Sequence, residues 1–347
     1  MVITNLLDMQ QVAWYLMTCS IAPQDKMNPT HLTRLLDTLR KLSADECVKA
    51  QTVLAERHRQ IESSIVLREL SEAVNSCPRC AGKAVTKAGS KGGRKRFVCK
   101  GCGKSFNVLT GTPLARLRMA DKHLEYAECM VGQVTVRDAA EMLGIEPRTA
   151  FLWRHRFLEA IRRIQPAKLG GVVEADETFF LESFKGSRKL PAGRKAKKRG
   201  TPAQKRGLSK EQIPVLVARD RSTGETLTCR ISSRKATDIG PALLPRLEKD
   251  AVLCSDGASA YRIIGKQAKI EVKSTPKKKA AGIYHIQNVN SYDSRLKNWV
   301  FGFFGIATKY LENYLGWHRL LDKTSHRMTS RDFLAAALGI MPSLATP

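Results

Sequence analysis

Two Cys-x-x-Cys pairs constrain the fold of this chain more than any other feature of its sequence. The four cysteines are Cys77, Cys80, Cys99 and Cys102, and 18 residues separate the two pairs. This spacing is typical of a structural zinc site, in which two turns supply four thiolates to one tetrahedral metal ion. A redox enzyme needs only one such pair, and reduced structural cysteines are the remaining alternative. The sequence therefore predicts one structural Zn²⁺ in a zinc ribbon over residues 71–110.

The chain is strongly basic, with 59 Lys and Arg against 32 Asp and Glu and a formal net charge of +27. Such a protein is attracted to polyanions, because Lys and Arg displace counterions from phosphates. One basic cluster is the tip of the ribbon hairpin, where we expect Arg94 and Arg96 to contact DNA. A ribosomal or other RNA-binding protein would share this charge.

A second basic cluster covers residues 185–210, which hold eleven Lys or Arg and no acid. We interpret this stretch as a mobile loop or a long hairpin insertion between two strands. It either contacts DNA or is a solvated insertion. The residues expected to contact DNA are Lys195, Lys197, Lys198 and Arg199.

No run of about 18 apolar residues occurs, so we expect no membrane span. The first residues lack the basic segment and cleavage site of a signal peptide. The chain has nine cysteines, and those outside the two pairs fall in apolar or amphipathic stretches. An odd number of cysteines favours a reducing compartment. The sequence therefore predicts a cytoplasmic protein.

Apolar periodicity and turn residues divide the chain into parts of a multidomain α+β protein. Helical spacing dominates before the ribbon and again directly after it. Pro166, Gly170 and Gly171 mark a boundary, beyond which strand patterns begin. Strands are expected at 172–180, 213–220, 226–232 and 251–255, and helix from about residue 288. The predicted order is a helical region of unreadable function (1–70), the zinc ribbon (71–110), a helix-turn-helix (111–166), an α/β domain (171–325) and a tail (326–347).

Residues 134–156 carry the pattern of a helix-turn-helix. Thr135 can cap a first helix, Gly144 makes the turn, and Pro147 suits the first turn of a second helix. The functional interpretation is a recognition helix in the major groove of DNA, and a plain helical hairpin is the alternative. We expect Ile145, Phe151, Leu152 and Phe157 to pack inward. The residues expected to reach DNA are Arg148, Arg154 and Arg156.

Two apolar strands carry acids at positions where burial would be costly without a partner or a metal. In the strand at 172–180, Glu174 and Asp176 share one face and Glu177 takes the other. The strand at 251–255 ends in Asp256, followed by Gly257. Two such carboxylates brought together can hold Mg²⁺ for phosphoryl chemistry. Taken singly, each aspartate could instead cap a turn.

A third polar group follows on the last helical segment. Asn290, Asp293 and Lys297 are three and four residues apart, so they lie on one helical face. An asparagine can bind a metal through its carbonyl oxygen, and Lys297 can hold a phosphate.

The chain resembles the bacterial insertion-sequence transposases of the ISXO-like group over roughly residues 70 to 320. The resemblance rests on the four ribbon cysteines and on "VVEADETFF", "SDGASAY", "HIQNVNSYDSRLKNW" and "GIATKYLENYLGWHR" in this order. It implies a zinc ribbon ahead of an RNase-H-like catalytic domain. The family's metal ligands, two Asp and a Glu, match Asp176, Asp256 and Asn290. One branch of the family has Asn at the third position with Lys seven residues later, which fits Lys297. Asp293 and Glu177 are alternative third carboxylates, ranked below Asn290.

The resemblance further implies a transposase that uses two Mg²⁺ or Mn²⁺ ions. It would bind double-stranded DNA as terminal inverted repeats and as target, in the nucleoid of a bacterial cytoplasm. It would hydrolyse the DNA at the element end and join the freed 3′-hydroxyl to target DNA. A homodimer or higher oligomer is expected because two ends must be joined. A catalytically inactive, transposase-derived DNA-binding regulator is the main alternative, and a junction resolvase would share the core chemistry.

Overall fold

The computed structural model describes residues 28–72, 74–91, 94–187, 189–190, 203, 209, 211–275, 283–325 and 327–340. The chain divides into two units, residues 1–58 and 59–347. The expected DNA contacts Lys195, Lys197, Lys198 and Arg199 lie outside the described residues. Among the helices that are described, none combines the length and apolarity needed to cross a bilayer.

The first unit contributes α2 (Pro29–Leu39) and the start of α3 (Ala44–Glu72). Asn28 caps α2, since its side-chain oxygen accepts a hydrogen bond from the Thr30 amide at 3.0 Å. Leu32, Leu35 and Leu36, which predict a helix by their spacing, lie on α2 and are exposed. The expected helices are therefore present in the described part of this unit.

In the second unit, the ribbon region follows α3. It is an antiparallel sheet of β1 (Val85–Lys91), β2 (Arg94–Cys99) and β3 (Ser105–Phe106), in that order. Phe97 and Phe106 stack with ring centroids 5.6 Å apart and form a small core with the buried cysteines Cys77 and Cys99. This core is too small to hold a sheet of this size alone, which is the usual reason for a metal in such folds.

Three helices follow: α4 (His123–Val131, after the 3₁₀ turn η2, Ala120–Lys122), α5 (Val136–Leu143) and α6 (Pro147–Ile161). The Thr135 hydroxyl accepts a hydrogen bond from the Asp138 amide at 3.4 Å and so caps α5. Gly144 ends α5 at a φ of 59°, a left-handed conformation that glycine adopts at little cost. Pro147 is the first residue of α6. The predicted pair of helices and the turn between them are present.

These helices share one core with the end of the chain. Trp153 and Phe157 of α6 are buried in the same cluster as Trp317 of α10 (Leu311–Lys323) and Phe333 of α11 (Ser330–Ala337). Residues 330–337 are therefore a packed helix, whereas the sequence predicts a tail from residue 326. The segment is short, and its apolar residues pack mainly against α4 and α6, far away in sequence.

A glycine allows α10 to approach the end of α6 closely. A Cβ atom at Gly316 would lie 2.5 Å from the Cα atom of Arg162 and 3.0 Å from its backbone nitrogen. Nearby, the buried Arg319 donates to the carbonyl oxygens of Ile164 at 2.6 Å and Arg162 at 3.2 Å. The backbone of Arg162 cannot move away without breaking these contacts.

We predict that Gly316→Ala lowers the free energy of unfolding by about 2 kcal/mol, because the added methyl group overpacks a backbone contact. Urea denaturation followed by far-UV circular dichroism measures this change. Gly302→Ala is the matched control, since its Cβ would meet nothing closer than 3.4 Å. Equal stability of the two variants would show that the backbone of Arg162 leaves room for a methyl group at position 316.

The α/β domain has a five-stranded sheet in the order β6-β5-β4-β7-β8. β5 pairs antiparallel with β4 and β6, and β7 pairs parallel with β4 and β8. All four predicted strands are present, and the polar edge strand β8 is the one that the sequence did not predict. The bounds are β4 (Val172–Leu181), β5 (Gln212–Asp220), β6 (Thr226–Arg230), β7 (Val252–Ser255) and β8 (Glu271–Ser274).

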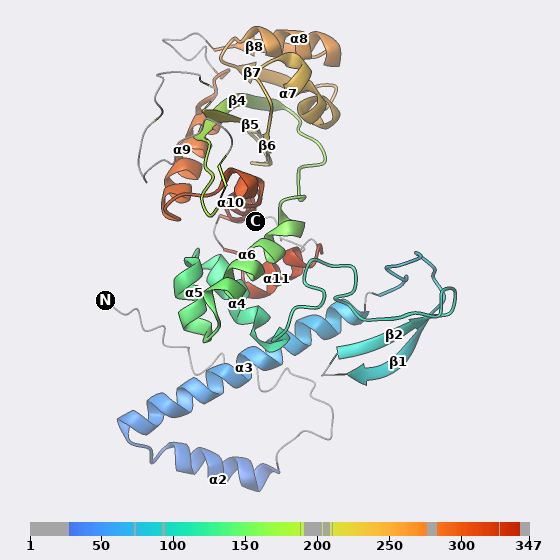
Figure 1. Ribbon diagram of the computed structural model, residues 1–347, viewed down its shortest axis with the longest axis vertical. Coiled ribbons are helices and arrows are strands. Elements are labelled where there is room, and N and C mark those ends of the chain that lie inside the picture. Colours follow the sequence, from blue (N-terminus) through green and yellow to red (C-terminus); the bar gives the residue numbers. More distant parts are fainter. Residues whose placement is uncertain are drawn as a thin grey trace. The chain divides into compact units, whose positions relative to one another are not determined.

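Helices cover both faces of this sheet (Figure 1). One face packs on α7 (Ala236–Leu243), the 3₁₀ turn η3 (Leu244–Arg246) and α8 (Ser259–Ala268). The other face packs on α9 (Gln287–Phe301) and α10, which the 3₁₀ turn η4 (Thr308–Tyr310) precedes. The central strand β4 therefore has α8 on one side and α9 on the other.

Candidate active site and zinc site

Asp176 lies on β4, and Asp256 follows directly after the end of the neighbouring parallel strand β7. In the register between β4 and β7, Val172 is opposite Val252 and Glu174 is opposite Cys254. Continuing this register by two residues would place position 256, just after the end of β7, opposite Asp176. Neighbouring strands are about 4.8 Å apart. The fold thus brings together two carboxylates that are 80 positions apart in the chain (256 − 176).

The electrostatics of this pair suit a cation. Burial raises the pKa of Asp176 to about 6, and the negative charges of Asp256 and Glu177 add to this rise. The Glu177 amide donates to one Asp176 oxygen at 2.8 Å, and the Ala258 amide donates to one Asp256 oxygen at 2.9 Å. Clustered carboxylates with a raised pKa gain most from a divalent metal.

Helix α9 adds a third carboxylate, from Asp293. This side chain is 8% exposed, and its Oδ1 atom is buried without a hydrogen-bond partner among the described residues. Burial raises the pKa of Asp293 to about 7, the charge of Asp176 raises it further, and Lys297 lowers it. Asn290 and Lys297 share the same side of α9 but are exposed. A buried carboxylate oxygen with no hydrogen-bond partner, within the electrostatic influence of Asp176, makes Asp293 a candidate ligand for a cation.

We predict that metal-free Asp293→Asn is more stable than the wild type by about 2 kcal/mol at pH 8. Because the pKa of Asp293 is raised to about 7, this carboxyl group favours the fold while protonated. Its contribution is present below pH 4 and is lost as the pH rises through 7. Urea denaturation without added Mg²⁺ or Mn²⁺, and without a chelator that would remove the ribbon zinc, measures the trend from pH 5 to pH 8. The control is Asp250→Asn, at an exposed position. A difference in free energy of unfolding between Asp293→Asn and wild type that stays constant with pH would contradict the prediction.

Glu174, on the same face of β4 as Asp176, is not free to bind a metal. Its carboxylate is fully buried and accepts hydrogen bonds from Arg221 at 2.8 and 2.9 Å. It also accepts from the backbone amides of Asn288 at 2.8 Å and Val289 at 3.1 Å, in the first turn of α9. The N-cap residue of α9, Ile286, has an apolar side chain and makes no capping hydrogen bond. Glu174 therefore caps α9 from β4 and aligns the helix with Asp176.

Glu177, on the opposite face of β4, is also paired. Its Oε2 atom accepts from the Nε atom of Arg234 at 2.6 Å, and its Oε1 atom accepts from the Tyr261 hydroxyl at 2.5 Å. Tyr261 is fully buried, and burial raises the pKa of its hydroxyl group. The sequence did not indicate Arg234 or Arg221 as site residues. Neither lies in a motif, and only the folded sheet brings them to the acids.

The four ribbon cysteines form a group whose sulfur atoms all lie within 4.8 Å of one another. The Sγ atoms of Cys77 and Cys102 are 3.8 Å apart, and those of Cys80 and Cys99 are 3.6 Å apart. Four sulfurs at about 2.3 Å from a tetrahedral zinc ion would be about 3.8 Å from each other. The geometry therefore fits a Cys₄ zinc site.

The structure separates the arginines that the sequence groups together as DNA contacts. Arg96 and Arg148 are exposed, and Arg94 is half-buried. Arg154 is 1% exposed and donates to the Val134 carbonyl oxygen at 2.5 Å, so the prediction that it contacts DNA is wrong. Its guanidinium lies over the Trp317 ring, 5.3 Å from the centroid. The half-buried Arg156 donates to the Ala115 carbonyl oxygen at 3.2 Å.

Helix α6 also presents apolar residues outward. Phe157 is buried as expected, whereas Phe151 and Leu152 are 42% and 53% exposed. The inward packing predicted for these two residues is therefore wrong. Trp153, Arg154, Phe157 and Leu158 make up the buried side of α6, which rotates Phe151 and Leu152 toward the surface.

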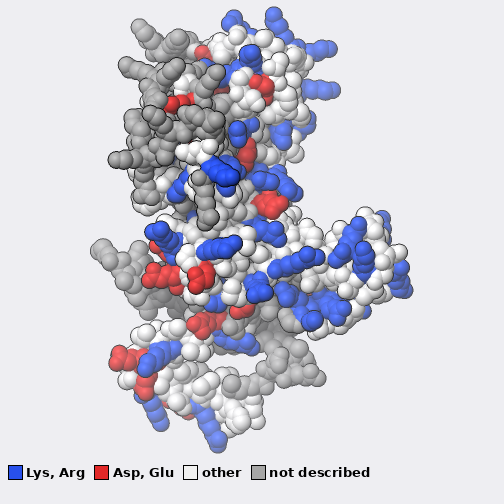
Figure 2. Space-filling model, in the orientation of Figure 1, with Lys and Arg blue, Asp and Glu red and all other residues white. Residues whose placement is uncertain are grey.

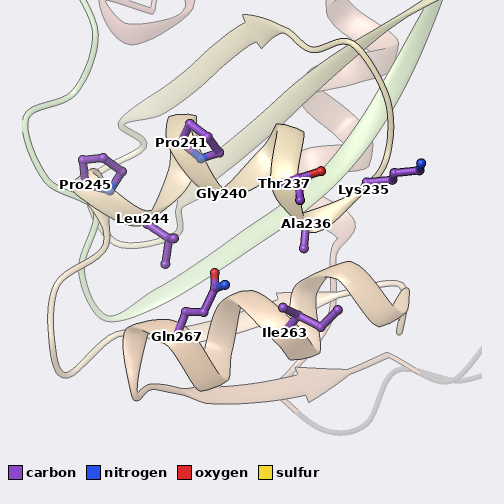
Figure 3. A pocket seen from close by; sticks show the side chains of 9 residues that line it. All are labelled: Lys235, Ala236, Thr237, Gly240, Pro241, Leu244, Pro245, Ile263 and Gln267. Carbon is purple, nitrogen blue, oxygen red and sulfur yellow. The ribbon is translucent and has the colours of Figure 1, made fainter.

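A groove of about 640 Å³ lies between α7 and α8 (Figure 3). Leu244 of η3 and Gln267 and Ile263 of α8 extend toward it, with Ala236 and Thr237 from α7. Its lining includes none of the candidate catalytic residues, and its walls are mostly apolar. The groove is separate from the carboxylate cluster.

A family model described as "ISXO2-like transposase domain" matches residues 168–317. A curated relative, "Uncharacterized protein in transposable element ISH50" from Halobacterium salinarum, is 26% identical over 252 residues. This match covers 69% of the present chain and 82% of that protein.

Two solved structures are also similar. The simian T-cell lymphotropic virus intasome in complex with PP2A regulatory subunit B56 gamma matches at 10% identity over 56% of this chain and 64% of that chain, with a TM-score of 0.27. The chain thus covers less than two thirds of that protein. The pre-cleavage Mos1 transpososome matches at 13% identity over 58% of this chain and 76% of that chain, with a TM-score of 0.21. At these TM-scores neither similarity establishes a shared fold.

The matched residues begin just before β4 and end within α10, so they contain Asp176, Asp256 and all of α9. The resemblance that the sequence indicates is confirmed: residues 168–317 match an ISXO2-like transposase domain, and together with the insertion-sequence relative this match supports an insertion-sequence transposase of that group.

Proposed function

We propose that this chain is an active DNA transposase that cleaves DNA at the ends of its element and joins those ends to target DNA. The observation that carries the proposal is the pair formed by Asp176, on β4, and Asp256, just past the end of the neighbouring parallel strand β7, with the pKa of Asp176 raised by burial and by Asp256. Such a pair suits Mg²⁺ or Mn²⁺, and phosphodiester chemistry is the usual task of such a site on a basic protein.

Asp176 and Asp256 would hold two catalytic metal ions, the number found in the two-metal sites of nucleases and polymerases. When bound, these ions would supply a Lewis acid for the phosphate and a lowered pKa for the attacking water. Asn290 is the third ligand that the family pattern implies, through its amide oxygen. Asp293 is the alternative, supported by its buried oxygen beside Asp176. Lys297 would contact a DNA phosphate from the exposed side of α9.

An RNase-H-like catalytic domain is supported by the mixed sheet, in which an antiparallel meander (β4, β5, β6) continues into two parallel strands with helices on both faces. We propose the boundaries 71–110 for the ribbon, 111–166 for the helix-turn-helix and 171–325 for this domain. The helix α11 belongs with the helix-turn-helix by its packing.

DNA binding is supported by the charge of the ribbon. Between Glu72 and Asp121 the sequence has no acidic residue, and residues 73–110 contain nine Lys or Arg. Figure 2 shows Lys and Arg spread over this region. Seven of these nine side chains are exposed: Arg79, Lys83, Lys87, Lys91, Arg96, Lys100 and Lys104. We infer that the ribbon binds the phosphate backbone, while Arg148, at the start of α6, reaches a base or phosphate in a groove.

The partners would be the terminal inverted repeats, the target DNA and at least one further copy of the chain, in the bacterial cytoplasm at the nucleoid. A second candidate function is an inactive DNA-binding regulator derived from such an element. The observation that favours a regulator is Asn290, which occupies a position where most of the family has Glu.

Purified protein incubated with the element's own ends, target plasmid and Mg²⁺ or Mn²⁺ tests the proposal. Cleaved ends covalently joined to plasmid would support the transposase. Binding of the ends without cleavage under either metal would support the regulator.

A further inference from the structure

We propose that Arg234 is a catalytic residue that contacts a DNA phosphate at the reacting bond. The assignment rests on the proposed transposase function and goes beyond the aspartates, Asn290 and Lys297. Arg234 lies in the turn between β6 and α7, on the opposite side of β4 from α9. It would therefore approach the phosphate from the side that Lys297 does not reach.

Glu177 holds Arg234 in place through one edge of its guanidinium group. The Nε atom donates to the Glu177 carboxylate at 2.6 Å, and the second oxygen of that carboxylate is occupied by Tyr261. The Glu177 side chain is 1% exposed, so its charge requires this partner. The pair is electrically neutral as a unit, which allows an arginine to lie beside a metal-binding site without repelling the metal.

The other edge of the guanidinium faces Asp256, with which it forms a long ion pair. Its Nη2 atom is 3.5 Å from Asp256 Oδ2, longer than a hydrogen bond, and the side chain is 37% exposed. Among the described residues, Arg234 donates a hydrogen bond only through Nε. Its two terminal nitrogens are therefore available to a ligand, and their planar fork matches two oxygens of a phosphate.

Arg221 provides an internal contrast. It also pairs with a buried glutamate of β4, but its nitrogens are used by Glu174 and by the carbonyl oxygens of Ile283 and His285. Arg221 thus serves the fold, with little donor capacity left for a ligand. Arg234 is fixed by its Nε hydrogen bond to Glu177, and its Nη2 atom lies near Asp256 without a hydrogen bond. Its terminal nitrogens can therefore donate to a phosphate.

The test compares single-turnover strand transfer by wild type and by variants at saturating DNA and Mg²⁺. Arg234→Lys keeps the charge beside Glu177, so it should fold, but it lacks the fork. Glu177→Gln with Arg234→Gln removes both charges and leaves no buried ion unpaired. We expect both variants to be slower by about 30-fold to 100-fold, with end binding and the half-saturating Mg²⁺ concentration unchanged. Lys235→Ala, the adjacent and exposed control, should stay within about twofold.

A second measurement identifies the contact. Substrates with one neutral methylphosphonate linkage, placed in turn at each phosphate around the reacting bond, are compared in wild type and Arg234→Lys. When the neutral linkage replaces the contacted phosphate, strand transfer by wild type should slow markedly. Strand transfer by Arg234→Lys should slow far less, because that variant already lacks the interaction.

The outcomes separate this assignment from the function on which it rests. If wild type joins DNA and both Arg234 variants match Lys235→Ala, the assignment fails and the transposase remains. It also fails if the slower rate is restored by more Mg²⁺, since Arg234 would then only arrange the metal ligands. If wild type joins no DNA, the proposed function fails and the assignment falls with it.

Discussion

Asp256→Ala and Asp176→Ala are each expected to reduce strand transfer by about 1,000-fold or more, equivalent to about 4 kcal/mol of lost transition-state stabilisation. The two carboxylates lie on β4 and just past the end of β7, and each would hold a metal that activates the phosphodiester. Removing either should empty a metal position without affecting the ribbon or α6. Binding to element ends, measured by fluorescence anisotropy in Ca²⁺, should stay within about threefold of wild type.

The same assay distinguishes the two candidates for the third ligand. If Asn290 binds metal, Asn290→Ala should raise the half-saturating Mg²⁺ concentration and lower the rate, while Asp293→Ala should have the smaller effect. If Asp293 is the ligand, as its buried oxygen beside Asp176 suggests, the order should reverse. Full strand transfer by Asp256→Ala would contradict the site altogether.

Cys99→Ser is expected to release the zinc ion and unfold the ribbon. Cys99 is fully buried in the small core with Phe97 and Phe106, and structural zinc contributes on the order of 10 kcal/mol to folding in domains of this size. Wild type should contain one zinc per chain by elemental analysis, and the variant close to none. Limited proteolysis should then cut the variant within residues 74–107.

The control is Cys47→Ser, which lies outside the four-cysteine group and should keep its zinc. Loss of the ribbon should also weaken DNA binding and reduce its salt dependence, because the cationic side chains of residues 73–110 would no longer form one surface. A Cys99→Ser protein with one bound zinc and the wild-type proteolysis pattern would contradict the assignment of the metal to these cysteines.

Local sequence signals predict much of this fold because their physics is local. The caps and turns at Thr135, Gly144 and Pro147 require only neighbouring residues, and each is found as predicted. The apolar runs that become β4, β5, β6 and β7 are long enough to be recognised. The edge strand β8 is short and polar, with the sequence Glu-Val-Lys-Ser, and carries no such signal.

Features that depend on distant partners could not be predicted in this way. Arg154 belongs to a helix that suits DNA contact, yet α10 and the segment before it supply Trp317 and Phe303 to cover its guanidinium. Glu174 shares a face of β4 with Asp176, but its carboxylate accepts hydrogen bonds from the first turn of α9, 114 residues away. Arg234 enters the site only because Glu177 is on the facing side of β4.

The central claim is tested most directly by incubating purified wild-type protein with labelled element ends and a supercoiled target plasmid in Mg²⁺, and separating the products on a denaturing gel. We expect label covalently joined to plasmid with wild type, none without added Mg²⁺ or Mn²⁺, and none with Asp256→Ala, which still binds the ends. Bound ends that remain uncut and unjoined in both Mg²⁺ and Mn²⁺ would contradict it.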